Sequence, residues 1–205
     1  VDNPVIQEDS LNADWIEQPG SSNISDKSIE NVLLEIAVPR DHAVRFGALP
    51  VQFRGRVMPM NTFSSEILRK IYKEQTFDFI NSDQFLLSLL TLPRVWAQVS
   101  FIAIPNEQIS VQYNLPKDYA SYYHFFDQKG NYRLLEQLQH IYHRPANGRT
   151  AAEKDLIKLD EQINIVSQLF NHSLPGIFPN PEDPSHTWYA PGEDLSVFKP
   201  QDSLF

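Results

Sequence analysis

The strongest constraint on the fold of this chain is a long amphipathic helix pattern towards its C-terminal end. Thr150-Ala151-Ala152-Glu153 is a capping box, in which the Thr and Glu side chains each accept a hydrogen bond from the other residue's free backbone amide. Apolar residues then recur at steps of three and four, at Leu156, Leu159, Ile163, Val166 and Phe170. At 3.6 residues per turn they form one stripe along about six turns. The stripe predicts a buried helix face.

The same periodicity predicts shorter helices earlier in the chain. Residues 40–46 favour a short helix that Gly47 ends. A second helix is expected from Thr62, a good N-cap residue, to about residue 72. A third begins at 81 or 82, and Pro93 either ends it or starts a new turn. A fourth covers 134–142.

Strand patterns are short and few. Residues 49–53 and 57–60 favour a hairpin that turns at Arg54-Gly55-Arg56. Residues 100–104 favour a short strand, and 110–113 favour one more weakly. The sequence therefore predicts a mainly α fold with a minor β element (α+β): a single helical domain with a short hairpin and extended termini.

Composition divides the chain into three parts. Residues 1–28 are polar and acidic, and we interpret them as an arm or linker with little packing of its own. Residues 29–180 form the expected globular domain. Residues 181–205 are rich in Pro and acidic residues, which predicts an extended C-terminal tail. The chain starts at Val1 without a visible signal peptide, so we expect a domain cut from a longer protein.

The absence of cysteine excludes several classes of protein. The chain has no disulfide framework, thiol nucleophile, iron–sulfur site or Cys-based zinc site, and it cannot itself be a c-type cytochrome. Its longest apolar run, residues 85–92, is far shorter than the roughly 18 residues that a membrane span needs.

The net charge of −9 is unevenly distributed. Residues 1–30 hold seven acidic residues against Lys27 alone, a net charge of −6. Residues 45–73 hold six basic residues against Glu66, a net charge of +5, and we call this segment the basic island. We expect no nucleic-acid partner, because phosphate neutralisation requires a continuous basic track. The island fits a compact anion or an acidic partner instead.

No catalytic constellation is recognisable in the sequence. Gly-x-Ser-x-Gly, His-Glu-x-x-His, the Gly-rich phosphate loops and the dinucleotide fingerprint are all absent. Asp160-Glu161 beside Lys158 is best interpreted as the solvated side of the long helix. We therefore predict no catalytic residue, and whether the chain belongs to an enzyme stays open.

The most informative motif covers residues 55–71, GRVMPMNTFSSEILRKI, and follows HAVRFGALPVQ at 42–52. Three segments lie downstream: DQFLLSLLTLPRVW at 83–96, KLDEQINI at 158–165 and FPNPEDPSHTWYAP at 178–191. In this order, the five segments resemble the extracytoplasmic domain of large cytochrome c biogenesis proteins of the fused CcsA/ResB type (system II), known from some Gram-negative bacteria. The resemblance covers nearly the whole chain after about residue 40.

This resemblance implies a location, partners and a function. Proteins of the family have membrane segments around a large extracytoplasmic domain, and they carry haem across the membrane and attach it to apocytochrome c. A periplasmic location is therefore expected. The expected partners are apocytochrome c and the membrane-embedded parts of the same polypeptide. The domain is expected to position the apocytochrome or to support the haem exit path. The alternative is an interaction scaffold without haem or substrate contact.

The resemblance assigns no haem ligand to this chain. The family's haem ligands and Trp-rich haem motif lie in or beside membrane helices, so we expect no cofactor in this domain and haem handling by the parent protein. His124 lies among aromatic residues, a position that can ligate haem iron but is more typical of a core. His140 and His143 can share a helix face, yet a surface pair near a helix C-terminus explains them, and we predict no metal site.

Eight residues of the family-like segments are candidate motif residues: His42, Gly55, Arg56, Pro59, Asn61, Thr62, Glu66 and Arg69. Their structural interpretation is that Gly55 permits a turn, Thr62 caps a helix, and Glu66 pairs with Arg69 or Lys70. For binding we single out Arg54, Arg56 and Arg69, because Arg holds a carboxylate through two parallel hydrogen bonds. Internal pairing of Arg54 and Arg56 with acidic residues in 1–30 remains open.

Overall fold

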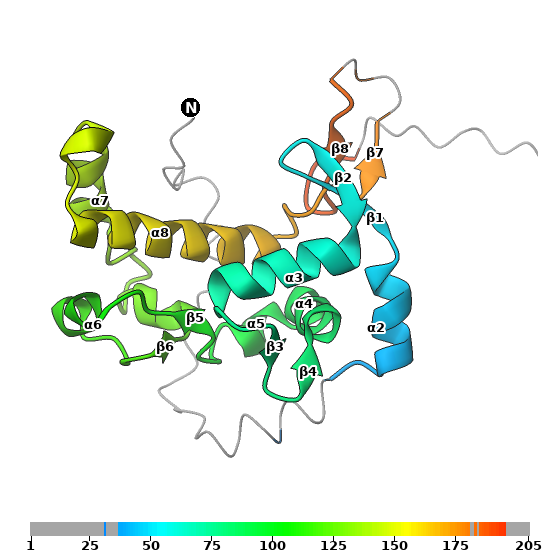
Figure 1. Cartoon of the computed structure of the whole chain (residues 1–205), viewed down its shortest axis with the longest axis horizontal. Helices are drawn as coiled ribbons and strands as arrows, with labels where there is room; N and C mark the ends of the chain where they lie inside the picture. The colour runs from blue at the N-terminus through cyan, green and yellow to red at the C-terminus, as the bar shows by residue number, and fades with distance from the viewer. Residues whose placement is uncertain (1–30, 32–36, 181–182, 184, 196–205) are drawn as a thin grey trace, which may run out of the picture.

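The computed structural model describes residues 31, 37–180, 183 and 185–195. Its architecture is mainly α with small antiparallel hairpins (Figure 1), so the predicted α+β class is confirmed. The predicted acidic arm at 1–28 lies outside the described residues, and so do 181–182, 184 and 196–205 of the predicted tail. None of the helices in the described ranges is long and apolar enough to cross a membrane.

Helix α8 (Ala151–Phe170) is the long helix that the sequence predicts. Thr150 Oγ1 accepts from the Glu153 amide at 3.3 Å, and Glu153 Oε2 accepts from the Thr150 amide at 2.7 Å. The capping box is therefore present. The stripe is buried as predicted, and completely so at Leu159, Ile163 and Val166.

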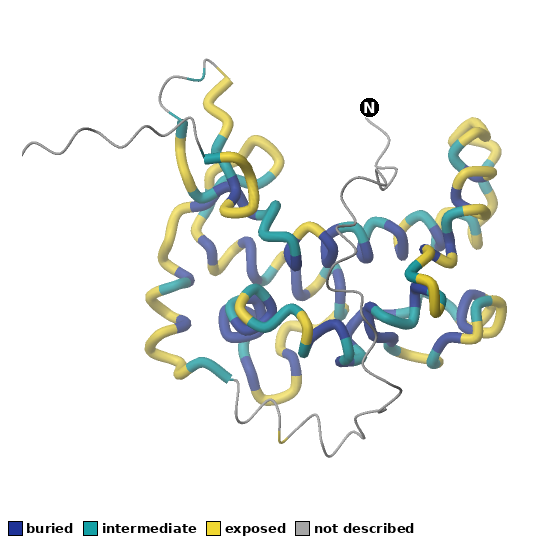
Figure 2. The backbone as a smooth tube through the Cα atoms, turned by 180° about the vertical axis from the view of Figure 1, so that it is seen from behind, coloured by how far each residue is buried: buried dark blue, intermediate teal, exposed yellow. Residues whose placement is uncertain are grey.

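Three helices form a group beside α8 (Figure 1). Helices α2 (Arg40–Gly47), α3 (Met60–Ile71) and α4 (Ser82–Thr91) pack on one another, and α4 also contacts α8. Helix α5 (Pro93–Trp96) follows α4 directly, so Pro93 starts a new turn. Buried residues gather towards the middle of the molecule, whereas α2 is exposed along most of its length (Figure 2). The core next to α4 includes the rings of Phe77, Phe85, Trp96 and Phe101, whose neighbouring centroids lie 4.9–5.8 Å apart.

The predicted N-cap of α3 is wrong. The helix begins at Met60, and Pro59 occupies the N-cap position without a side-chain hydrogen bond, which leaves Thr62 inside the first turn. The Met60 amide donates to the Leu49 carbonyl at 2.7 Å. Because this backbone carbonyl satisfies the first helical N–H, the helix starts without a capping side chain.

The predicted hairpin is present as β1 (Pro50–Phe53) and β2 (Arg56–Pro59), with Phe53 opposite Arg56. Its two-residue loop is Arg54-Gly55, and φ is positive at both positions, 52° and 74°. Positive φ at both central residues is the geometry of a type I′ turn. Asn, Asp or Gly is preferred at the first of these positions, so Arg54 is an unusual occupant.

The other strand pairs are two residues long. They are β3 (Thr76–Phe77) with β4 (Ile80–Asn81), β5 (Ile102–Ala103) with β6 (Tyr119–Ala120), and β7 (Phe178–Pro179) with β8 (Trp188–Tyr189). Strand β5 lies inside the predicted 100–104 segment. Strand β7 lies at the end of the predicted globular domain (29–180) and β8 lies in the predicted tail (181–205), so this pair joins the two parts.

The weak strand prediction at 110–113 is wrong, because these residues end helix α6 (Glu107–Tyr113). The side chain of Asn106 accepts from the Ile109 amide at 3.0 Å and caps a helix at this point. Helix α7 (Leu135–Tyr142) confirms the prediction for 134–142. Short 3₁₀ turns, η3 (Tyr122–Phe125) and η4 (Ala146–Gly148), complete the described part of the chain.

Candidate functional site

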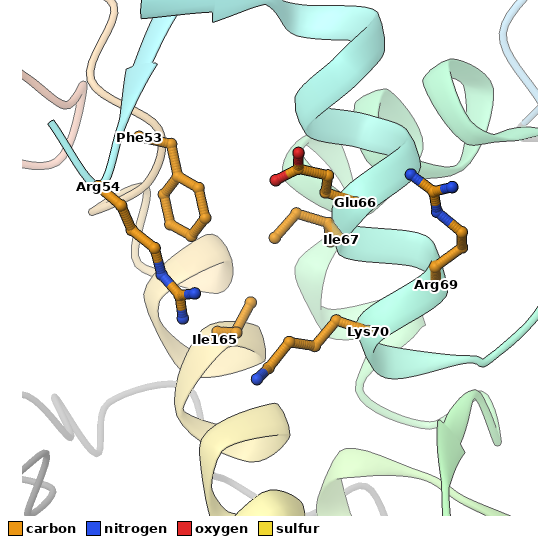
Figure 3. A pocket seen from close by; sticks show the side chains of 7 residues that line it. All are labelled: Phe53, Arg54, Glu66, Ile67, Arg69, Lys70 and Ile165. Carbon is orange, nitrogen blue, oxygen red and sulfur yellow. The ribbon is translucent and has the colours of Figure 1, made fainter. Parts of the chain in front are cut away.

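A pocket of about 220 Å³ lies where the β1–β2 hairpin, α3 and α8 meet (Figure 3). Apolar and charged side chains line it together: Phe53, Arg54, Glu66, Ile67, Arg69, Lys70 and Ile165. Figure 3 shows Arg54 and Lys70 reaching from opposite sides towards Ile165, while Arg69 points away from them. The structure thus brings the predicted residues Arg54 and Arg69 to one pocket. The third, Arg56, is exposed on β2 and does not line it.

Arg54 is held in position by its backbone and by Phe53. An L-residue in the left-handed region costs roughly 1–2 kcal/mol relative to the right-handed one, and Arg54 adopts φ 52°. Its guanidinium carbon lies 5.1 Å from the centroid of the Phe53 ring, a cation–π distance. The Phe53 ring packs edge-on against Phe63 at 5.0 Å, so the platform under the guanidinium is anchored in α3. Within the described residues Arg54 forms no ion pair.

Lys70 closes the opposite side of the pocket. Its ammonium lies 2.6 Å from Glu161 Oε2 on α8, with the two side chains 33% and 39% exposed. The Lys70 carbonyl also accepts from Gln162 Nε2 at 2.6 Å. Burial lowers the pKa of Lys73, and the neighbouring ammonium groups of Lys70 and Lys158 lower it further. Cations therefore crowd the C-terminal end of α3, where the helix dipole favours positive charge.

Glu66 and Arg69 do not pair as predicted. Arg69 Nε donates to the Ser65 carbonyl of its own helix at 3.2 Å. Glu66 is exposed and has no ion-pair partner in the part of the chain that the structure describes, since Lys70 pairs with Glu161 instead. Glu66 and Lys70 are four residues apart on α3, a spacing that allows an ion pair, but Lys70 pairs with the Glu161 carboxylate of α8.

Gly47, Asn61 and Asp83 join three of the family-like segments. Asn61 Nδ2 donates to Asp83 Oδ2 at 3.1 Å. A Cβ atom on Gly47 would lie 2.5 Å from the same oxygen, so glycine at this position leaves room for the Asp83 carboxylate between α2 and α4. Asn61 is thus a structural residue of the motif. His42 is exposed on α2, five residues before Gly47.

Gln52 joins the hairpin to the C-terminal segment. Its Oε1 accepts from the Trp188 amide at 2.8 Å, and its Nε2 donates to the His186 carbonyl at 2.8 Å. Its backbone N–H and C=O pair with Gly176 at 2.8 and 3.1 Å. A Cβ atom on Gly176 would lie 2.6 Å from the Trp188 carbonyl oxygen. The LPVQ and HTWY segments therefore meet in space.

The interpretation of Asp160 as solvated is wrong. Asp160 is 2% exposed, and its carboxylate accepts from the hydroxyls of Tyr132 at 2.9 Å and Tyr142 at 2.8 Å. Burial raises its pKa, although these two hydrogen bonds act in the opposite direction. The carboxylate ties α7 and the preceding loop to α8. The two acidic residues of the KLDEQINI segment therefore have separate roles. Asp160 accepts from two tyrosine hydroxyls, and Glu161 forms an ion pair with Lys70.

Two of the histidines, His124 and His172, make structural contacts. His124 Nδ1 lies 2.7 Å from Ser121 Oγ and accepts from the Ser121 amide at 3.1 Å. Burial lowers the pKa of His124, and the charge of Arg133 lowers it further. His172 Nε2 lies 2.9 Å from the Leu90 carbonyl oxygen, a partner that the sequence did not indicate. His140 and His143 are exposed at the end of α7, and no group of three potential metal ligands occurs among the described residues.

Sequence reasoning missed most of the pocket. Phe53 lies in a predicted strand and Ile165 in the predicted long helix, and the sequence singles out neither as a binding residue. Glu161 was interpreted, together with Asp160, as part of the solvated side of that helix. A signal for Glu161 was present: both it and Lys70 lie in family-like segments, on helices with complementary charges. Nothing local in the sequence indicated that the two helices meet at these residues.

Comparison with known proteins identifies one similar sequence. No protein-family model matches this chain. The chain is 32% identical over 160 residues to Protein NrfI of Wolinella succinogenes. The aligned region covers 77% of this chain and 18% of NrfI, so the chain spans less than one fifth of that relative's length.

Proposed function

We propose that this chain is the extracytoplasmic domain of a membrane protein of cytochrome c biogenesis, of the fused CcsA/ResB type (system II), facing the periplasm. The ordered resemblance of five segments supports this proposal. The similarity to NrfI supports the general role, cytochrome c maturation. In this account haem is handled by the membrane-embedded parts of the parent protein. The domain positions the apocytochrome or supports the haem exit path.

The observation that carries the proposal is that the family-like segments interlock. Gln52 bonds to Trp188 and His186, Asn61 bonds to Asp83, and Lys70 pairs with Glu161. Short patterns that resemble a family by chance would not be expected to meet pairwise across 22 to 136 residues of sequence. The segments behave as one packed unit, which is what a shared domain requires.

The working surface in this proposal is the end of the hairpin, with Arg54 over the pocket and Arg56 beside it. Both are exposed, and neither forms an ion pair among the described residues, whereas Gln52 and Asn61 hydrogen-bond to distant segments. Guanidinium groups bind carboxylates in bidentate fashion, and an acidic patch on an apocytochrome offers such groups.

The test replaces Arg54 and Arg56 together with Gln in the full-length parent protein and measures holocytochrome c by haem staining. A matched control replaces Arg45, an exposed arginine of α2 in the same basic island. We expect the double variant to accumulate normally but mature less cytochrome, while the control matures a normal amount. Normal maturation by the double variant would favour the alternative, a scaffold without substrate contact. Loss of the folded protein would instead indicate internal pairing of the two arginines.

A further inference from the structure

We propose that the pocket at Phe53, Arg54 and Lys70 is a receptor for a single carboxylate side chain, Glu or Asp, presented by a partner polypeptide. This inference rests on the proposed function, in which the end of the hairpin contacts a partner, and it specifies which chemical group of the partner binds there.

The size of the pocket selects the ligand. Small-molecule and cofactor sites typically enclose about 300–1,000 Å³, whereas this pocket encloses about 220 Å³. A volume below this range suits one side chain better than a whole cofactor. The apolar surface of the pocket, at Phe53, Ile67 and Ile165, suits the short aliphatic stem of an acidic residue.

The charges of the pocket select an anion. Figure 3 shows the guanidinium of Arg54 and the ammonium of Lys70 approaching the same apolar surface from opposite sides. Lys70 already holds one carboxylate, that of Glu161 at 2.6 Å, one turn before Ile165 on α8. Arg54, which has no ion pair among the described residues, is left to receive a second one. A carboxylate beside Phe53 would gain a charge-assisted hydrogen bond from Arg54, with the Lys70 ammonium on the opposite side of the pocket adding to the positive charge.

The backbone at Arg54 is the second, independent observation. A hairpin loop selected for stability would carry Asn, Asp or Gly at the first position of its type I′ turn. Arg54 stands there at φ 52° and projects over Phe53. Strained positions of this kind concentrate where a side chain has to be presented to a ligand.

Glu66 supplies an internal test, because it lines the same pocket with the opposite charge. Its carboxylate repels an incoming one. Replacing it with Gln should therefore strengthen binding, and structural damage does not produce such a gain.

The probe is a fluorescein-labelled peptide with several Glu residues spaced by Ala and Leu, titrated with the full 205-residue chain and followed by fluorescence anisotropy. The matched peptide carries Gln in place of Glu. Arg54→Asn removes the cation and keeps a residue that suits the turn. Glu66→Gln removes the repulsion. Arg45→Gln removes an equal charge from the same basic island, outside the pocket.

We expect binding of the Glu peptide and not of the Gln peptide. Arg54→Asn should weaken it about tenfold, the loss of one charged hydrogen bond. Arg45→Gln should change it less than about twofold, and Glu66→Gln should tighten it about threefold, as expected for a single like charge removed at a solvent-exposed site. Equal losses with Arg54→Asn and Arg45→Gln would show a diffuse charge effect. No gain with Glu66→Gln would show that the peptide carboxylate does not enter the pocket that Glu66 lines. Either result overturns the proposal.

Binding that appears only after the acidic residues of 1–30 are neutralised would assign the pocket to this chain's own segment, and would also overturn it. The assay is independent of cytochrome maturation. The two proposals can therefore fail separately. If the chain binds the Glu peptide through Arg54 but the parent protein matures no cytochrome, the carboxylate receptor is supported and the proposed function is contradicted.

Discussion

The Trp188 amide donates to the side-chain oxygen of Gln52 at 2.8 Å, across 136 residues of sequence. The second arm of the same side chain donates to the His186 carbonyl, also at 2.8 Å. Gln52 thus acts as an additional peptide group between the β1–β2 hairpin and the C-terminal segment. The hairpin that presents Arg54 is positioned from the far end of the chain.

Gln52→Ala should therefore destabilise the fold. The substitution leaves the Trp188 amide and the His186 carbonyl without this partner, and we expect the free energy of unfolding to fall by about 1–3 kcal/mol in urea melts. Gln98→Ala is the control, because Gln98 Nε2 donates only to the Arg94 carbonyl one turn earlier. It should cost less than about 0.5 kcal/mol. Equal losses in the two variants would contradict a specific role for Gln52.

Gly47→Ala should be destabilising despite the better helix propensity of alanine. The new Cβ would lie 2.5 Å from Asp83 Oδ2, so this buried carboxylate, which accepts from Asn61 Nδ2, has to move, at a cost of about 1–3 kcal/mol. Gly148→Ala is the matched control, with nothing within 4 Å of its Cβ position, and should be neutral or stabilising. In an Asp83→Ala background the cost of Gly47→Ala should shrink. An unchanged cost in that background would place the clash elsewhere.

Ile163→Ala should cost about 2–5 kcal/mol of unfolding free energy, the usual range for an emptied core site. Ile163 is completely buried on the stripe of α8 that faces the body. Gln168→Ala on the exposed side of the same helix should change the value by less than about 0.5 kcal/mol. A loss below about 1 kcal/mol for Ile163→Ala would show that the stripe does not carry the core.

The contributions of Asp160 and Asp155 to the free energy of unfolding should change with pH in opposite directions. Burial raises the pKa of Asp160, so between pH 4 and the raised value the unfolded chain releases the proton first, and this group's contribution to stability falls as pH rises. The hydrogen bonds from Lys158 and Asn106 lower the pKa of Asp155, so its contribution is present above the unfolded pKa and is lost as pH falls.

Unfolding free energies of Asp160→Asn and Asp155→Asn, each relative to the unmodified chain from about pH 2 to pH 7, measure this difference, because the contribution of Asp155 is lost mainly below its unfolded pKa of about 4. The relative stability of Asp160→Asn should improve with rising pH, and that of Asp155→Asn should improve with falling pH. Parallel trends in the two variants would contradict the burial of Asp160 between Tyr132 and Tyr142.

The sequence correctly predicted the elements that are determined by interactions between residues close together in the chain. The capping box at Thr150, the period of the α8 stripe and the Arg54-Gly55 turn each depend on neighbours a few residues away, and each is present. The start of α3 was misplaced because the Leu49 carbonyl, and not a cap side chain, satisfies the first amide. The strand at 110–113 failed because Asn106, four residues upstream, caps a helix there.

The candidate site was predictable only in part. Arg54 and Arg69 were identified from charge, and they do line one pocket, but its other wall comes from α8, about 90 residues away. Asp160 appeared solvated because its polar type suggested exposure, and its two tyrosine partners lie 18 and 28 residues away in sequence. Contacts of this kind depend on how helices pack, which the periodicity of one helix does not specify.

The most direct test of the account is whether the hairpin touches apocytochrome c. A photo-crosslinking amino acid replaces Val57, 57% exposed on β2 beside Arg56, in the full-length parent protein. The control replaces Val111, 76% exposed on α6, at the end of the molecule away from the hairpin (Figure 1). After irradiation of cells that produce the apocytochrome, the account predicts an adduct containing apocytochrome c from position 57 and not from position 111. No adduct at position 57, or equal adducts at both positions, would contradict it.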